Sequence, residues 1–181
     1  MHTNIHKKFL NPQTVLFLAG LKTNQTVVDL GAGSGFFALA AAGIVGGNGL
    51  VQVVDVKDSA LDHLVAESKM RGFKNVKTYL ANLDHAKLPG HIHIDQADMV
   101  ILSNILHEVS DHKNLIAHAY ALLKTGGKLV VIDWNDQPGN FGPSADRRIG
   151  QGQAKKLLDS SLKFIKEIET DQYHFGMVFE K

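Results

Sequence analysis

Two aspartates and three glycines in this chain have the types and the spacing of a site for a charged small molecule. Asp29 comes two residues before the alternating glycines Gly31, Gly33 and Gly35, between an apolar β-rich stretch and a helix-compatible one. A glycine backbone lets a ligand approach closely, and the first turn of a helix offers unpaired N–H groups to a phosphate or a carboxylate. Asp55 follows Gly35 by 20 residues, which is about where a carboxylate that binds a ribose is expected.

The details of this pattern favour S-adenosylmethionine over a nicotinamide dinucleotide. A dinucleotide fingerprint expects its third small residue at position 36, where this chain has Phe36. A pyrophosphate close to Asp29 would also be repelled by its charge, whereas an ammonium group would be attracted. S-adenosylmethionine carries an ammonium group, a carboxylate and a sulfonium at one end and an adenosine at the other, so Asp29 suits its methionine half and Asp55 its ribose. The alternative is that both aspartates only end strands and cap helices.

Length and composition predict one domain. The chain has 181 residues, of which 44% are hydrophobic, so it can bury one core with little room for a second. With 19 basic and 18 acidic side chains its net charge is +1, which gives no electrostatic footprint for nucleic acid or an anionic membrane. The absence of cysteine excludes disulfides, thiolate metal sites and cysteine nucleophiles, and fits the reducing cytoplasm, where we expect the protein. No apolar run approaches the ~20 residues that a membrane span needs.

Strand and helix patterns alternate along the chain. Strands are expected over 27–30, 51–55, 76–80, 98–103 and 128–133, and helices over 12–19, 36–42, 61–72, 113–123 and 151–158. Alternation at this interval predicts βαβ units around a parallel sheet. Residues 135–150 contain prolines and glycines and are expected to form a long exposed loop, and the stretches 162–169 and 173–180 an antiparallel edge hairpin.

Two further motifs complete a family resemblance. Residues 103–109 are Ser-Asn-Ile-Leu-His-Glu-Val and residues 123–129 are Leu-Lys-Thr-Gly-Gly-Lys-Leu. With the glycine run and Asp55 in order before them, the chain resembles class I S-adenosylmethionine-dependent methyltransferases over residues 9–134. It is most similar to the small-molecule branch of the ubiquinone and menaquinone biosynthesis type. The resemblance implies an α/β fold with a Rossmann-like, doubly wound sheet of seven strands, ordered 3-2-1-4-5-7-6, with strand seven antiparallel.

The single expected domain, residues 1–181, would have three parts. Residues 1–22 would form an N-terminal helix and lid, in which His6 to Leu10 fold over the site. Residues 23–134 would form the cofactor-binding core, and residues 135–181 the substrate loop and the C-terminal hairpin.

Carried over residue by residue, the resemblance assigns the cofactor site. One group would surround the methionine half, another would bind ribose and adenine, and a third would line the methyl end. The methionine group is Asp29, Gly31, Ala32, Gly33 and Gly35, and the ribose and adenine group is Asp55, Val56, Asn82 and Leu83. The methyl-end group is Ser103 and Asn104. Asn82 stands where the family often has an acid that receives the adenine amino group, and its side-chain oxygen can still accept this hydrogen bond.

His107 is the candidate catalytic base, because it follows the fourth strand and can titrate near neutral pH. The alternative is that its ring caps or packs a helix start. His107 and His112 are five residues apart and diverge around a helix, and the pair His91 and His93 lacks a convincing third ligand, so no metal site is predicted. Trp134 and Arg148 are the candidate substrate residues, for stacking on a planar acceptor and for pairing with an anion.

The chain is therefore expected to transfer a methyl group from S-adenosylmethionine to a small molecule by in-line displacement, with S-adenosylhomocysteine as the product. The acceptor site would be open, completed by a second copy in a homodimer, or suited to a protein or RNA end. A methyltransferase of protein or RNA is thus one alternative. Others are a catalytically degenerate subunit that binds the cofactor for a partner, and a nicotinamide-linked oxidoreductase.

Overall fold

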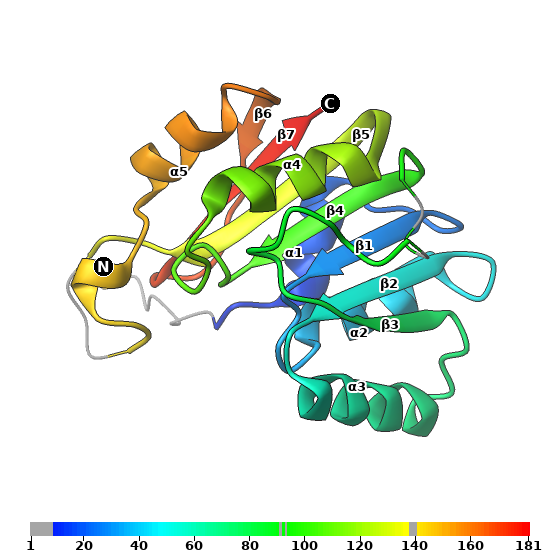
Figure 1. The fold of residues 1–181 in the computed structure, drawn as a ribbon. Coiled ribbons are helices and arrows are strands. Elements are labelled where there is room, and N and C mark those ends of the chain that lie inside the picture. Colours follow the sequence, from blue (N-terminus) through cyan, green and yellow to red (C-terminus); the bar gives the residue numbers. More distant parts are fainter. Residues whose placement is uncertain (1–8, 91, 93, 138–140) are drawn as a thin grey trace, which may run out of the picture.

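Seven strands of the described residues form one mixed sheet, in the order β3-β2-β1-β4-β5-β7-β6 (Figure 1). The computed structural model describes residues 9–90, 92, 94–137 and 141–181. Five strands are parallel, while β7 runs antiparallel to both β5 and β6. The predicted strand order and the antiparallel seventh strand are confirmed. The strands are β1 (Thr26–Leu30), β2 (Leu50–Asp55), β3 (Val76–Leu80), β4 (Ala97–Ser103), β5 (Leu123–Trp134), β6 (Lys163–Glu167) and β7 (His174–Glu180).

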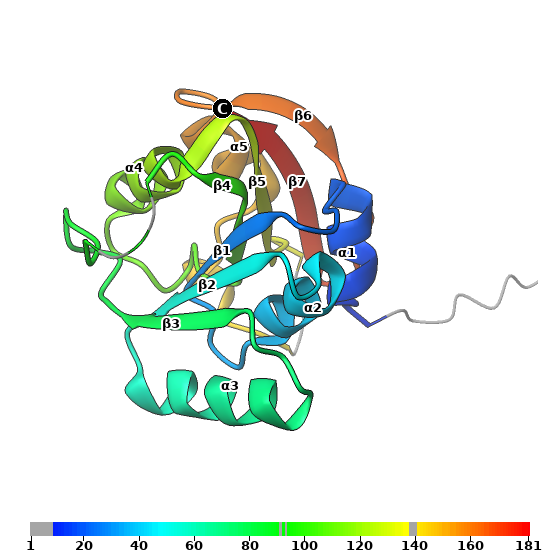
Figure 2. The ribbon, with the colours of Figure 1, turned by 90° about the vertical axis from the view of Figure 1, so that its right-hand side faces the viewer.

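Helices cover both faces of this sheet (Figure 2). One face packs on α1 (Pro12–Ala19), α2 (Phe36–Val45) and α3 (Asp58–Met70), and the other on α4 (His112–Leu122) and α5 (Gln151–Leu158). Successive strand residues alternate between the two apolar clusters, because side chains of a strand point to opposite faces. Val28 and Leu30 lie in the cluster under α4 and α5, and Val27 in the cluster under α1 to α3.

The fifth strand begins earlier than the sequence predicts. The sequence patterns place a helix over 113–123 and a strand over 128–133, with Gly126 and Gly127 in the connection between them, yet β5 starts at Leu123 and contains both glycines. Their segment forms a bulge, because β4 pairs first with Leu123 and then with Lys128. Gly126 has a φ of +74°, and a Cβ on Gly127 would lie 2.8 Å from the carbonyl oxygen of Ala97. Glycine is therefore required here for a close backbone approach within the sheet.

The parallel strands place their carboxyl ends at one edge of the sheet. The loops after β1, β2, β3, β4 and β5 meet there, so residues that are distant in the chain become neighbours (Figure 1). Because β7 is antiparallel, its first residue lies at this same edge, and His174 pairs in register with Trp134 at the end of β5. Within the described part of the chain, no helix is long and apolar enough to span a bilayer.

Candidate functional site

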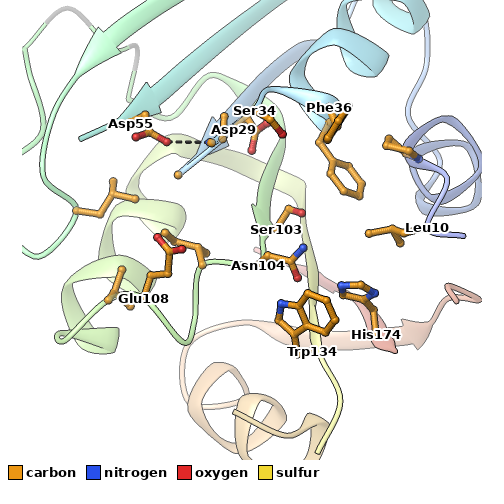
Figure 3. A pocket seen from close by; sticks show the side chains of 18 of the residues that line it. Leu10, Asp29, Ser34, Phe36, Asp55, Ser103, Asn104, Glu108, Trp134 and His174 are labelled. Carbon is orange, nitrogen blue, oxygen red and sulfur yellow. Dashed lines mark hydrogen bonds between the residues drawn. The ribbon is translucent and has the colours of Figure 1, made fainter. Parts of the chain in front are cut away.

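A cavity of about 680 Å³ opens at the carboxyl ends of the central strands. Figure 3 shows that side chains from the loops after β1, β2, β4 and β5, from the N-terminal segment and from β7 converge on it. The cavity brings together most of the predicted site residues. These are Asp29, Gly31, Ala32, Gly33, Asp55, Val56, Asn82, Leu83, Ser103, Asn104 and Trp134.

The three glycines after β1 serve different purposes. All three have a positive φ, of +74° at Gly31, +53° at Gly33 and +77° at Gly35. A Cβ would collide with Ile105 at Gly31 and with Leu64 at Gly35, whereas a Cβ on Gly33 would meet nothing within 4 Å. Gly33 therefore leaves room for a ligand against its backbone, and Gly31 and Gly35 allow the neighbouring elements to pack closely. Gly35 is the N-cap residue of α2 and lies outside the cavity lining.

Asp29 is a fully buried carboxyl group at the cavity. Neither of its oxygens has a hydrogen-bond partner of ordinary geometry among the described residues. Burial raises the pKa of Asp29 to about 7, nearby Asp55 adds to the rise, and the backbone N–H of Ala38 acts against it. A buried carboxylate with no partner is costly, so this position calls for a cationic group in the cavity.

Asp55 is held by the backbone on both sides. Its Oδ2 accepts a hydrogen bond from the N–H of Gly33 at 2.8 Å, drawn as a dashed line in Figure 3. Its Oδ1 accepts one from the N–H of Lys57, also at 2.8 Å. Each carboxylate oxygen has about two acceptor positions, so one on each oxygen is left. The fixed carboxylate can therefore accept two neighbouring hydroxyl groups, as a ribose offers.

Beyond Asp55 the cavity offers apolar surface. Val56 is exposed there, and Leu83, which is largely buried, also lines the cavity. The Oδ1 of Asn82 accepts the N–H of Asp84 at 2.9 Å, which uses one of its two acceptor positions in a local turn. Asp84 also lines the cavity, and its Oδ1 accepts the backbone N–H groups of residues 110 and 111, just before α4. The pKa of Asp84 is lowered, and the hydrogen bond from the N–H of residue 111 is the largest cause. No sequence motif pointed to Asp84.

Ser103 is the last residue of β4 and Asn104 follows it, and both line the cavity. Asn104 has a φ of +53°, a conformation that is unfavourable for residues with a Cβ. Its Oδ1 is buried and has no hydrogen-bond partner among the described residues. A strained backbone and an unpaired acceptor in a cavity are typical of a ligand-binding position.

His107 does not line the cavity. Its Nδ1 lies 3.2 Å from Oδ1 of Asp133, and its side chain is 9% exposed. Asp133 is fully buried and also accepts the N–H groups of Leu106 and Trp134. This cluster fixes the segment after β4 against the end of β5. In the structure His107 has a packing role, and its role as the base stays a prediction.

Arg148 is not part of the cavity lining either. Its guanidinium group donates to the backbone carbonyls of residues 135, 137, 141 and 143, at 2.6 to 3.3 Å. It also lies 5.7 Å from the centre of the Trp134 ring. Arg148 therefore fastens the loop after β5 around Trp134, and its binding of an anionic substrate stays a prediction.

His174 and Asp171 are site residues that sequence analysis missed. Both line the cavity, and Nδ1 of His174 lies 2.7 Å from Oδ1 of Asp171. Oδ2 of Asp171 accepts the N–H of Leu10 at 3.2 Å, so the N-terminal segment reaches the cavity. Phe9 and Leu10 line it, while residues 6–8 of the predicted lid lie outside the described residues. The signal in the sequence was an aspartate three residues before a histidine in the turn of the predicted hairpin.

Known proteins with similar sequences carry out methyl transfer. A family model described as a methyltransferase domain matches residues 21–172. The ubiquinone/menaquinone biosynthesis C-methyltransferase UbiE of Psychromonas ingrahamii is 31% identical over 120 residues, which cover 65% of this chain and 45% of that protein. The protein of the same name from Haemophilus ducreyi is 30% identical, over 65% of this chain and 44% of its own length. The chain thus spans less than half the length of these curated relatives.

Solved structures share the fold. A methyltransferase from Aquifex aeolicus, described as S-adenosylmethionine-dependent, superposes with a TM-score of 0.86 at 24% identity, covering 94% of this chain and 89% of that one. A putative type 11 methyltransferase from Sulfolobus solfataricus gives a TM-score of 0.75 at 22% identity, covering 96% and 94%. At these identities the likeness concerns the fold, which is the Rossmann-like fold of these two proteins.

Proposed function

This chain belongs to the methyltransferase domain family, and we propose that it transfers the methyl group of S-adenosylmethionine to a small, largely apolar acceptor. The observation that carries the proposal is the buried carboxylate of Asp29, whose oxygens lack hydrogen-bond partners in the described part of the chain. The ammonium group of S-adenosylmethionine supplies the positive charge that this position calls for. The pyrophosphate of a nicotinamide dinucleotide would instead be repelled there.

The rest of the cavity supports the same ligand. Gly33 leaves open space for the carboxylate of the methionine half near the start of α2, where backbone N–H groups and the helix dipole favour an anion. Asp55 offers two acceptor positions to the ribose hydroxyls, and Val56 offers an apolar face to adenine. When bound, S-adenosylmethionine supplies a methyl carbon on a cationic sulfonium, so the protein mainly aligns donor and acceptor and excludes water.

The walls of the cavity support a largely apolar acceptor. Phe9, Phe36 and Phe141 line the cavity and are exposed, and Trp134 adds a further ring. Aromatic walls favour a planar, apolar ligand, for which stacking adds to the gain from burial. The similar curated proteins are named C-methyltransferases of ubiquinone and menaquinone biosynthesis, which supports a carbon atom of an apolar ring as one acceptor.

Isothermal titration with S-adenosylmethionine, S-adenosylhomocysteine and NADH tests this proposal without knowledge of the acceptor. We expect the two sulfur nucleosides to bind and NADH not to bind. Asp55→Ala should weaken the binding of S-adenosylhomocysteine by ~1–3 kcal/mol through the lost charged hydrogen bonds. Asp62→Ala, which removes an exposed carboxylate from α3, is the matched control and should leave binding unchanged. Binding of NADH alone, or equal affinities of the two variants, would contradict the proposal.

A further inference from the structure

We propose that His174, positioned by Asp171, is the general base that takes a proton from the methyl acceptor. The inference rests on the proposed function and deepens it, because it assigns the proton transfer to a pair that sequence reasoning did not single out. It also defines a property of the acceptor, which must carry a removable proton on the atom that is methylated.

Asp171 fixes the ring of His174. The side chains of Asp171 and His174 are only 4% and 7% exposed, and Oδ1 of Asp171 lies 2.7 Å from Nδ1 of His174. The same oxygen accepts the backbone N–H groups of Tyr173 and His174, each at 2.9 Å. A carboxylate can only accept, so Nδ1 of the ring carries the hydrogen. The lone pair of a neutral His174 is therefore on Nε2.

The Nε2 atom of His174 is buried and has no hydrogen-bond partner among the described residues. His174 lines the cavity across from Asp55, beside Trp134 and Asn104 (Figure 3). A buried acceptor without a partner is costly, and at a cavity wall a bound ligand can supply the missing donor. His107 offers no such atom to the cavity, since it lies outside the lining.

A carboxylate and an aromatic ring flank His174, on which proton transfer places a positive charge. The carboxylate of Asp171 stabilises an imidazolium, as in other pairs in which a carboxylate orients a histidine. The Trp134 ring lies with its centroid 4.2 Å from that of His174, at an interplanar angle of 39°, and aromatic rings attract cations. The guanidinium group of Arg148 lies 5.7 Å from the centre of the Trp134 ring, and its N–H groups donate to backbone carbonyls of the loop. The rings of Tyr173 and Phe141 pack at a tilt, with centroids 5.4 Å apart and an interplanar angle of 58°.

The proton transfer balances with the methyl transfer. The acceptor atom gives its proton to Nε2 of His174, and the electron pair left on this atom forms the bond to the methyl carbon. The bond between methyl carbon and sulfur breaks, and its electron pair stays on the sulfur, which becomes neutral. The imidazolium of His174 then loses the proton to water. A phenol or an enol that is methylated on its oxygen meets the requirement for a removable proton. For an activated ring carbon the order is reversed: its π electrons form the bond to the methyl carbon first, and Nε2 of His174 then takes the ring proton, which restores the aromatic ring.

The protonation of His174 is tested by NMR of protein with ¹⁵N-labelled histidine and bound S-adenosylhomocysteine. His174→Gln assigns the signals, and we expect a neutral ring with hydrogen on Nδ1 and none on Nε2. Asp171→Asn should abolish this preference, because the amide can donate as well as accept. Hydrogen on Nε2 of the neutral ring in the unaltered protein would overturn the proposal.

The transfer itself is tested with 4-nitrophenol, whose phenolate form has a distinct absorbance. At a pH below the pKa of the free phenol, we expect the unaltered protein with bound S-adenosylhomocysteine to hold the probe as phenolate. His174→Gln should hold it as the neutral phenol, while His63→Gln, which changes an exposed histidine of α3, should behave as the unaltered protein. An ionised fraction that is the same with and without His174, or no greater than in buffer, would overturn the proposal.

Failure of this inference is distinguishable from failure of the proposed function. By titration calorimetry, His174→Gln should bind S-adenosylhomocysteine with unchanged affinity, because His174 lies across the cavity from Asp55 (Figure 3). Loss of binding only in His174→Gln would overturn the assignment of a base and indicate a cofactor contact. Absence of binding to the unaltered protein would refute the proposed function itself. Once an acceptor that the protein methylates is known, His174→Gln should lower kcat by roughly 10²–10⁴-fold. Asp171→Asn should lower kcat less.

Discussion

Replacing Asp29 by asparagine should make the ligand-free protein more stable above neutral pH and less able to bind its cofactor. Burial raises the pKa of Asp29 from 3.8 to about 7, and one pKa unit corresponds to about 1.4 kcal/mol. Holding this carboxyl group ionised therefore costs the folded protein about 4 kcal/mol. Asparagine has nearly the same shape and never ionises, so the variant avoids this cost.

The sign of the pH dependence follows from which state keeps the proton. The folded-state pKa of Asp29 lies above the unfolded value, so between pH 3.8 and about 7 the folded protein holds a proton that the unfolded chain has lost. Stability from this group is therefore full below pH 3.8 and falls as the pH rises to about 7, above which it is constant. The stability of Asp29→Asn relative to the unaltered protein should then rise by about 3 kcal/mol between pH 5 and pH 8.

Urea unfolding at both pH values measures this change. Comparing the stability difference between Asp29→Asn and the unaltered protein at the two pH values cancels the constant cost of burying the amide of asparagine. The control is Asp62→Asn, which changes an exposed residue of α3. Calorimetry gives a second measurement. In the unaltered protein, affinity for S-adenosylhomocysteine should rise from pH 5 to pH 7, because the ammonium group of this ligand binds the charged form of Asp29. In Asp29→Asn, the affinity should be weak and should not change with pH. A stability difference that is the same at pH 5 and pH 8 would refute the reasoning.

Two further substitutions test how the site is held in place. Gly35→Ala should lower the free energy of unfolding in urea by ~1–3 kcal/mol, because its Cβ collides with Leu64 at a φ of +77°. Gly46 also has a positive φ, but a Cβ there meets nothing within 4 Å, so Gly46→Ala should lower the free energy of unfolding less. Equal losses in the two variants would contradict the role of the collision. Arg148→Met should make residues 135–150 more sensitive to limited proteolysis, since it removes four hydrogen bonds to backbone carbonyls of the loop, with little change in Tm. Unchanged cleavage would argue against the fastening role.

Much of the fold could be predicted because local patterns specify it. The bounds of β3 (Val76–Leu80) and α5 (Gln151–Leu158) agree with the sequence patterns, and α1 ends before Gly20 at a φ of +87°. The start of β5 could not be predicted, since two consecutive glycines are typical of a turn. Whether they form a turn or a bulge depends on the neighbouring strand, which requires the close approach at Gly127.

The candidate site divides in the same way. Asp29 and Asp55 are each the last or next-to-last residue of a parallel strand, so the pattern of strands was enough to bring them together. His107 also follows a strand, yet its ring packs on Asp133 outside the cavity. Position along the chain fixes the edge of the sheet at which a side chain lies, but the direction of the side chain depends on its packing.

The sequence by itself determined where the residues proposed to bind the cofactor lie, because these glycines and acids belong to consecutive strand and helix units. Only the tertiary structure decided the acceptor half. The antiparallel course of β7 carries His174 back to the edge where the parallel strands end, beside Trp134, which lies 40 residues earlier in the chain. Such a contact depends on the pairing of strands across the sheet, and no local pattern of residues encodes it.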